Sequence, residues 1–238
     1  MSDAALRLVN VSKSYGGVTA LRDVCLDVRP GECFGLAGAN GAGKTTLIKC
    51  MLDLSDIDAG TIEIFAAQHR APGARARLAF LPERFSPPYY LSGRDFLRYL
   101  LALHRTAYDA SSTARAVAGL DLAPDALDKP ARSYSKGMTQ KLGLAACLLS
   151  AKQMLVLDEP MTGLDPKARA LFKQQLRALR ASGRTVLLTS HALADIEELC
   201  DRMAILHEGR LRFTGAPSEL LQAYGARDLE EAFLSCIA

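Results

Sequence analysis

Short apolar runs separated by turn residues indicate where this chain forms strands. The runs at 5–11 and 24–28 are rich in β-branched residues, and Gly16-Gly17 lies between them, which predicts two antiparallel strands. Further strands are expected at 33–37, 60–65, 78–81, 154–157, 185–189 and 203–206. The later runs are continuously apolar and alternate with helices, which indicates a parallel sheet buried on both faces.

Helices are expected where apolar residues recur with the helical spacing. These segments are 46–52, 95–105, 112–120, 142–149, 166–181, 192–200 and 228–236. The stretch from about 84 to 150 is helical and punctuated by prolines, so we interpret it as an insert in an α/β core. The core then covers about 1–83 and 151–215, and a short helical tail covers 216–238.

Composition limits the classes of protein that this chain can belong to. Its 238 residues suffice for a single α/β domain with a sizeable core. With 29 basic and 26 acidic residues the net charge is +3, which gives no argument for a nucleic-acid partner or an anionic membrane. The longest apolar stretch, 142–151, is too short to span a membrane.

The N-terminus and the cysteines indicate a cytosolic protein. The first residues lack the basic-then-apolar pattern of a secretory signal. The six cysteines form no C-x-x-C pair, and most lie in apolar runs as small core residues do. We therefore expect reduced thiols and a cytoplasmic location.

Residues 38–45 read G-A-N-G-A-G-K-T and fit the phosphate-binding pattern G-x-x-x-x-G-K-[ST]. A predicted strand precedes the loop and a predicted helix follows it, which is the context that the motif requires. Its glycines let backbone N–H groups approach phosphate oxygens at a helix N-terminus. Lys44 can reach the β- and γ-phosphates, and the Thr45 hydroxyl can ligate Mg²⁺. The candidate nucleotide-binding residues are Asn40, Gly41, Ala42, Gly43, Lys44, Thr45 and Thr46.

Two adjacent carboxylates, Asp158 and Glu159, end the predicted strand at 154–157. A parallel sheet binds its ligand at the carboxyl ends of its strands, so both carboxylates are expected near the phosphate loop. Asp158 is a candidate ligand of Mg²⁺. Glu159 is a candidate catalytic residue that orients or deprotonates a water molecule for attack on the γ-phosphate.

A second loop of interest precedes the apolar helix at 142–149. Ser135 has the character of a helix cap, and Gly137 leaves backbone N–H groups accessible. These residues alone allow two interpretations, a second anion-binding site or a plain helix cap.

Several motifs follow one another in a specific order. After the phosphate loop and the helical insert come Ser-x-Gly-x-x-Gln at 135–140, Leu-Asp-Glu-Pro at 157–160, Gly-Leu-Asp-Pro at 163–166 and Thr-Ser-His at 189–191. This order resembles the nucleotide-binding domain of the ATP-binding cassette (ABC) ATPases, and the resemblance extends over about residues 5–215. It implies a P-loop NTPase fold: a mostly parallel sheet flanked by helices, with an antiparallel β subdomain and a helical insert.

The resemblance also implies roles for individual residues. Tyr15 corresponds to the aromatic residue that stacks on adenine. His191 corresponds to the switch histidine that contacts the γ-phosphate and positions Glu159, which with Lys44 completes the expected catalytic set. Glu83 replaces the usual glutamine that senses the metal and the attacking water, so whether it contacts the metal directly is left open.

Three further residues imply a dimer. Ser135 and Gly137 resemble the signature loop, which contacts the γ-phosphate bound to the opposite protomer. Asp165 resembles the loop aspartate at the dimer seam. The resemblance thus implies a homodimer that holds two ATP molecules and Mg²⁺ between its copies.

The family resemblance predicts an ATPase subunit of an ABC transporter. The forms Leu-Pro-Glu at 81–83 and Tyr-Ser-Lys-Gly-Met at 134–138 are similar to the ATPase subunits of bacterial exporters of the drug-resistance and sodium-export type. A separate transmembrane permease subunit is expected to dock beside Glu83 and the helical insert, near the aromatic segment 85–91. The chain would then be peripheral on the inner face of the membrane.

A soluble ABC-type ATPase that regulates ribosomes or DNA is the alternative. Such proteins usually carry two cassettes or a long coiled-coil insertion, and this sequence has neither. A small-molecule kinase would leave the signature loop and His191 without an explanation.

Overall fold

The computed structural model describes residues 4–238, and its first layer is an antiparallel sheet. The strand order is β2-β1-β4-β5. The strands are β1 (Leu6–Tyr15), β2 (Val18–Val28), β4 (Ala59–Ile64) and β5 (Ala67–Gln68). As predicted, the first two form a hairpin around Gly16-Gly17, where both glycines have positive φ. Both strands extend further towards the turn than their apolar runs. Their ends near the turn are mostly exposed, so an apolar pattern does not mark them.

The second layer is the predicted parallel sheet, with the strand order β10-β9-β3-β8-β7-β6. Its strands are β3 (Cys33–Ala37), β6 (Leu78–Leu81), β7 (Met154–Leu157), β8 (Thr185–Ser190), β9 (Arg202–His207) and β10 (Arg210–Gly215). All neighbouring strands are parallel except β10, which pairs antiparallel with β9. The carboxyl ends of β3, β7 and β8 therefore meet at one edge.

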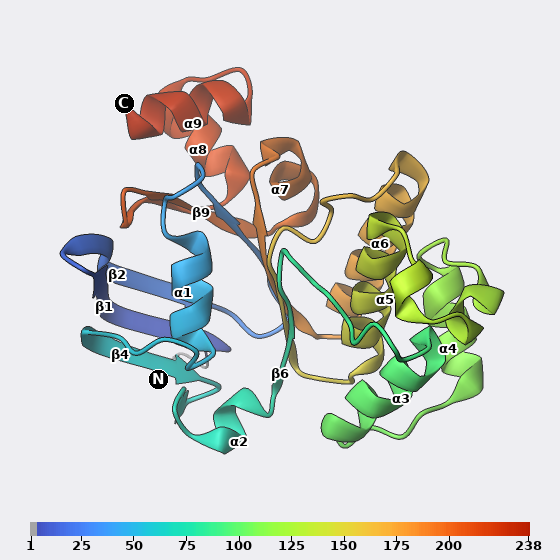
Figure 1. Cartoon of the computed structure of the whole chain (residues 1–238). Coiled ribbons are helices and arrows are strands. Elements are labelled where there is room, and N and C mark those ends of the chain that lie inside the picture. The colour runs from blue at the N-terminus through green and yellow to red at the C-terminus, as the bar shows by residue number, and fades with distance from the viewer. Residues whose placement is uncertain (1–3) are drawn as a thin grey trace.

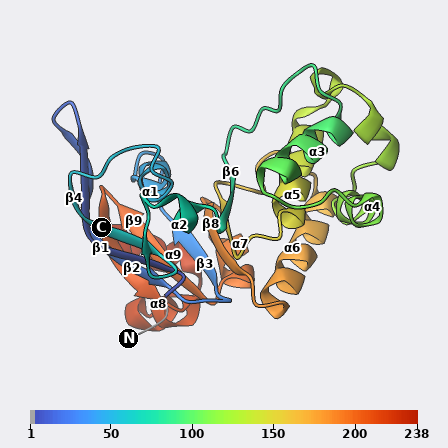
Figure 2. The same ribbon diagram turned by 90° about the horizontal axis from the view of Figure 1, so that it is seen from below.

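The helices fall into a core set and a helical lobe, which we define as residues 93–149 (Figures 1 and 2). The lobe contains α3 (Gly93–Leu103), α4 (Ala110–Ala118), α5 (Lys136–Leu149) and two 3₁₀ turns at Pro124–Asp128 and Ala131–Ser133. The other helices are α1 (Lys44–Met51), α2 (Pro72–Arg75), α6 (Pro166–Ala181), α7 (Leu193–Leu199), α8 (Pro217–Tyr224) and α9 (Leu229–Ile237).

Four elements were missing from the sequence prediction: β5, β10, α2 and α8. Strand β10 escapes a search for apolar runs because its exposed positions carry charged and polar side chains. The predicted helix at 142–149 begins earlier, at Lys136, because Ser135 caps it. The tail holds two helices, where the sequence pattern indicated one.

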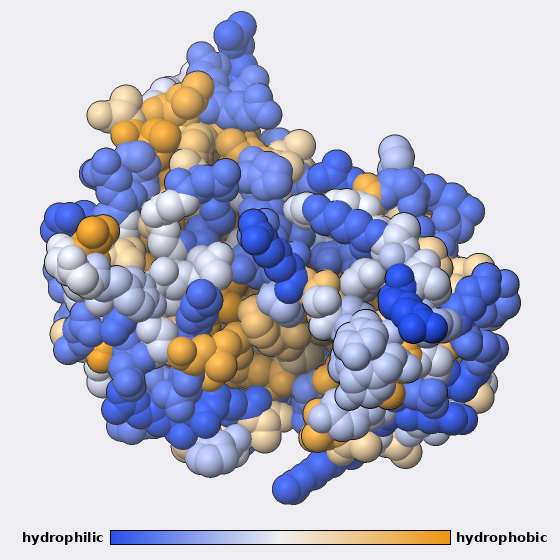
Figure 3. Space-filling model, viewed as in Figure 1, coloured by the Kyte–Doolittle hydropathy of each residue, from blue (hydrophilic) through white to orange (hydrophobic). Residues whose placement is uncertain are grey.

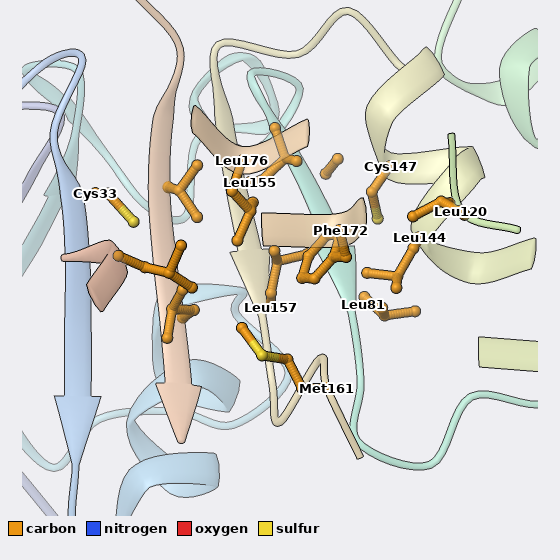
Figure 4. Packing of buried hydrophobic residues seen from close by; sticks show 14 of the residues in the cluster. Cys33, Leu81, Leu120, Leu144, Cys147, Leu155, Leu157, Met161, Phe172 and Leu176 are labelled. Carbon is orange, nitrogen blue, oxygen red and sulfur yellow. The ribbon is translucent and has the colours of Figure 1, made fainter. Parts of the chain in front are cut away.

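Alternate residues of the parallel sheet face two separate cores. Phe34 and Leu36 of β3 pack with α1 and the antiparallel sheet, whereas Leu155 and Leu157 of β7 pack with α5 and α6. In Figure 4, Phe172 of α6 lies beside the β7 side chains and near Leu144 of α5. The sheet thus joins the helical lobe to the core on one face and holds α1 on the other.

Exposed apolar surface is local. In Figure 3, apolar side chains gather over the C-terminal helices and in the hollow between the helical lobe and the core. Leu234 of α9 has 64% of its surface exposed. No helix within residues 4–238 is long and apolar enough to cross a membrane.

Candidate active site

The phosphate loop connects β3 to α1 at the carboxyl edge of the parallel sheet. Gly43 is the N-cap of α1 and has a φ of 112°. A Cβ at this position would lie 2.6 Å from the carbonyl oxygen of Ala20, so only glycine fits without a shift of backbone. The loop opens onto a cavity of about 510 Å³. Its lining is Ala20, Asn40, Gly41, Ala42, Gly43, Lys44, Thr45, Thr46, Glu83, Asp158, Glu159, Thr162 and His191.

Lys44 is a buried cation inside this cavity, with 8% of its surface exposed. Its Nζ donates hydrogen bonds to the carbonyl oxygens of Gly38, at 2.6 Å, and Ala39, at 3.2 Å. Burial lowers the pKa of Lys44, and the carboxylates of Glu159 and Asp158 partly offset that shift. A buried ammonium group facing two carboxylates is placed to neutralise a polyanionic ligand.

Asp158 is held by hydroxyl groups from two neighbouring elements. It is 2% exposed; one carboxylate oxygen accepts from Thr45 Oγ1 at 3.1 Å and the other from Thr189 Oγ1 at 2.7 Å. The Thr189 hydroxyl in turn accepts from the backbone N–H of Glu159 at 2.9 Å. This network links the phosphate loop to the ends of β7 and β8.

Glu159 and His191 form a hydrogen-bonded pair at the mouth of the cavity. His191 Nδ1 lies 2.8 Å from Glu159 Oε2. Glu159 has a φ of +49°, a conformation that is uncommon for residues other than glycine and that clusters at functional sites. The pair can orient a water molecule or accept its proton.

The donor set of the cavity fits Mg²⁺. Mg²⁺ prefers oxygen ligands and is usually bound through one or two carboxylates together with substrate phosphates. Asp158 and the Thr45 hydroxyl are such donors, next to each other at the start of α1. Among residues 4–238, no three His, Cys, Asp or Glu side chains form a metal-binding group. The protein ligands alone therefore suit a magnesium–nucleotide complex better than a closed metal site.

Ser135 and Gly137 lie at the N-terminus of α5 and are not part of the phosphate-loop lining. Ser135 is the N-cap of this helix, and its Oγ accepts from the Met138 N–H at 3.2 Å. A Cβ on Gly137 would lie 3.0 Å from the carbonyl oxygen of Gly163, so this loop packs against the backbone of the Gly-Leu-Asp-Pro segment. The described residues that line the phosphate-loop cavity include neither Ser135 nor Gly137.

Asp165 belongs to the Gly-Leu-Asp-Pro segment and is the N-cap of α6. Its side chain accepts from the Ala168 N–H at 2.9 Å and from Lys141 Nζ at 3.0 Å. These two bonds lower the pKa of Asp165. The segment is thereby fixed to both α5 and α6.

A family model described as ABC transporter matches residues 21–162, which include the phosphate loop, Ser135, Gly137, Asp158 and Glu159. The chain belongs to the ABC transporter family. It is an ATP-binding subunit of this family and, as an enzyme, an ATPase.

Relatives and solved structures agree with that family. The chain is 37% identical to the Nod factor export ATP-binding protein I of Sinorhizobium fredii, over 98% of this chain and 68% of the relative. It is 38% identical to the protein of the same name from Paraburkholderia xenovorans, over 98% and 78%. A solved ATP-binding subunit of an ABC transporter superposes with a TM-score of 0.89 at 28% identity, covering 98% of this chain and 99% of that one.

A second solved structure shows the same fold. It is a dimeric ATP-binding cassette in a post-hydrolysis state bound to ADP and Pi, with a TM-score of 0.81. At 21% identity, over 89% of this chain and 98% of that one, the likeness concerns the fold alone.

Tyr15, like Ser135, Gly137 and Asp165, was assigned by the ABC family resemblance but does not line the cavity. Tyr15 lies at the end of β1, 46% exposed, and its hydroxyl is 2.8 Å from Ser55 Oγ. Its adenine-stacking role stays a prediction. Conversely, Ala20 and Thr162 line the cavity but were not among the candidates. No motif marks Ala20, which comes from β2, whereas the position of Thr162 three residues after Glu159 was an available signal.

Proposed function

We propose that this chain is the ATPase subunit of an ABC exporter and that it works as a homodimer with two ATP molecules between its copies. One observation carries the proposal. Lys44, Asp158, Glu159 and His191 line one cavity, whereas Ser135, the N-cap of α5, lies outside it. A site divided in this way is completed when a second copy contributes the missing loop.

In the proposed dimer, Ser135 and Gly137 of one copy contact the γ-phosphate bound to the other. Ser135 is exposed, so its hydroxyl can reach a ligand presented by a second molecule. The packing of Gly137 against Gly163 joins the signature loop to the Gly-Leu-Asp-Pro segment. We assign Asp165 of that segment to the dimer seam.

Within each half-site, the chain's own residues bind ATP and activate water. Backbone N–H groups of the phosphate loop and Lys44 hold the phosphates. Glu159 accepts the proton of the attacking water, and the hydrogen bond from His191 fixes its orientation. Thr45 and Asp158 would hold Mg²⁺, which offsets the negative charge of the phosphates when bound.

The permease is proposed to dock on the side of the helical lobe that faces Glu83. Glu83 lines both the phosphate-loop cavity and a neighbouring groove of about 570 Å³ that also includes Phe85, Tyr134 and Gln140. A partner in this groove would contact the same residue that faces the nucleotide. The relatives named for Nod factor export support the exporter direction. In this proposal the subunit lies on the cytoplasmic face of the membrane, bound to the permease.

The decisive experiment replaces the proposed general base. Glu159→Gln should retain ATP binding but lower turnover by about 10²- to 10⁴-fold, because the amide cannot accept the proton. With ATP and Mg²⁺ this variant should accumulate as a dimer in light scattering. Glu197→Gln, an exposed glutamate of α7, is the matched control and should behave as wild type. Wild-type turnover of Glu159→Gln, or a strictly monomeric ATP complex, would contradict the proposal.

A further inference from the structure

Asp195 is a buried carboxylate that the proposed mechanism does not use. It lies in the first turn of α7, and only 4% of its surface is exposed. Two cations of α6 hold its two oxygens: Arg169 Nη2 is 3.0 Å from Oδ2, and Lys173 Nζ is 2.9 Å from Oδ1. Because an uncompensated buried charge is costly, these two ion pairs hold α7 firmly against α6.

The two helices joined by this ion pair begin at two loops of the active site. Asp165 is the N-cap of α6, one turn before Arg169, and α7 starts two residues after His191. The Arg169 side chain lines a cavity of about 280 Å³ that also includes Glu159, Gly163 and His191. Arg169 therefore lies beside both the Gly-Leu-Asp-Pro segment and the hydrogen-bonded pair.

His191 depends on its backbone for its position. Its side chain is 66% exposed, and Glu159 is the hydrogen-bond partner that the described residues provide for its ring. The backbone turn that carries it is closed by Ser190 Oγ, which accepts from the Ala192 N–H at 3.0 Å. After this turn Leu193 is buried, and Asp195 is the first side chain held by ion pairs, so those ion pairs help to fix where the turn lies.

Arg169 is also incompletely satisfied in this arrangement. Its Nε is buried, and among residues 4–238 it has no hydrogen-bond partner. A buried donor without a partner costs free energy, which the ion pair with Asp195 must offset. Arg169 is thus held by Asp195 in a place that its own hydrogen bonding does not favour.

We propose that Arg169 is a positioning residue: through Asp195 it fixes the turn that carries His191, and it thereby couples the segment 163–165 to the hydrogen bond between His191 and Glu159. This inference rests on the proposed roles of His191 and Glu159. It explains how a contact of the second copy with Asp165 would change the position of His191, and with it the orientation of Glu159.

The first test measures turnover and ATP affinity separately. Arg169→Ala should lower kcat by about 10- to 100-fold, the range expected when a catalytic group is misplaced. KM for ATP should change little, because the phosphate loop is intact. Arg169→Lys, which keeps the cation, should recover most of the loss. Arg177→Ala is the matched control, since Arg177 lies on the same helix and pairs with Glu198 rather than Asp195. Thermal unfolding checks that each variant is folded. We expect the Arg169 variants to fold, because Lys173 still pairs with Asp195.

The second test asks whether Arg169 acts through His191. In a His191→Ala background, Arg169→Ala should cause little further loss of single-turnover hydrolysis, because the group it positions is already absent. The same fold-loss in both backgrounds would overturn the inference and leave the proposed site intact. Full activity of His191→Ala alone would overturn the site assignment and the inference with it.

Discussion

Helices α1 and α5 each have a glycine within two residues of the N-cap, Gly43 and Gly137, yet their N-termini are capped differently. Helix α1 has Gly43 as its N-cap, and within the described chain no side chain caps it. Its first N–H groups remain available to a phosphate, and the buried Lys44 follows immediately. Helix α5 is capped by its own serine, Ser135, which accepts the Met138 N–H.

The start of α1 lies in a pocket, whereas the start of α5 lies on the surface. The start of α1 faces a cavity in which Asp158 and Glu159 are already positioned by hydrogen bonds. The start of α5 has exposed residues, Ser135 and Lys136, and lies outside that cavity. An anion can enter the first site from solvent, whereas in the proposed dimer the second would meet a ligand bound to the other copy. The two helices therefore suggest different roles in binding ATP and in closing the dimer.

The largest effect on ATP turnover is expected when the lysine at the start of α1 is replaced, and the lysine at the start of α5 serves as the comparison. Lys44→Ala should lower ATP turnover by at least about 10²-fold, because it removes a buried cation from the phosphates. It should also weaken ATP binding to the single chain. Lys136→Ala should leave that binding near wild type, since Lys136 is exposed on the other helix. Nucleotide titration at low protein concentration measures both, and an equal loss of affinity in the two variants would remove the distinction.

The site at α1 could be predicted from sequence because its determinants are local. The phosphate loop, the preceding strand and the following helix are adjacent in the chain, and Asp158-Glu159 end an apolar run. The same holds for most of the parallel sheet. Helix α8 was missed although its start carries a readable signal, namely Pro217 in the first turn and Glu219, whose carboxylate accepts from the Ala216 N–H.

The residues that surround the motifs could not be found in this way. Ala20 reaches the phosphate loop only because β2 folds over it, and the contact requires glycine at 43. Arg169 and Asp195 are one ion pair among many possible ones, separated by 26 positions in the chain. Charged residues on helices are usually solvated, so burial of Asp195 becomes evident only after α6 and α7 are packed.

A smaller effect is expected from the cap of α5, and α3 offers a matched control. Ser92 caps α3 by accepting the Asp95 N–H at 3.1 Å, as Ser135 does for Met138 on α5. Ser92→Ala and Ser135→Ala should each lower the free energy of unfolding by about 1 kcal/mol. Only Ser135→Ala should also lower ATPase activity, by about 10-fold, the loss expected for one hydrogen bond to a charged group.

Two measurements distinguish these contributions. Urea unfolding gives the effect of each cap on stability, and phosphate release as a function of protein concentration gives its effect on the dimer. If Ser92→Ala lowers activity as much as Ser135→Ala, the cap of α5 has a structural role only. The start of α5 would then not be a ligand-binding surface, and the comparison with α1 would lose its functional meaning.

The smallest effect on hydrolysis is expected at the exposed segment that precedes the helical lobe. Tyr89 and Tyr90 are 67% and 69% exposed, and their rings pack edge to face with centroids 5.4 Å apart. Their segment is fixed to the lobe, since the Tyr89 carbonyl accepts from the Arg132 N–H at 3.3 Å. Exposed, ordered aromatic residues are enriched at protein interfaces. Two prolines separate them from Phe85 and Ser86, which line the groove shared with Glu83.

Replacing Tyr89 and Tyr90 together with alanine should therefore leave the stability and the ATPase activity of the isolated chain nearly unchanged, because neither ring is buried or near the phosphate loop. The same variant should lose co-purification with the permease, and the permease should no longer change its rate of hydrolysis. Tyr224→Ala, an exposed tyrosine on α8, is the control and should retain the partner. Retention of the permease by the double variant would show that docking uses another surface. A loss of hydrolysis in the isolated chain would show that this segment serves the nucleotide site itself.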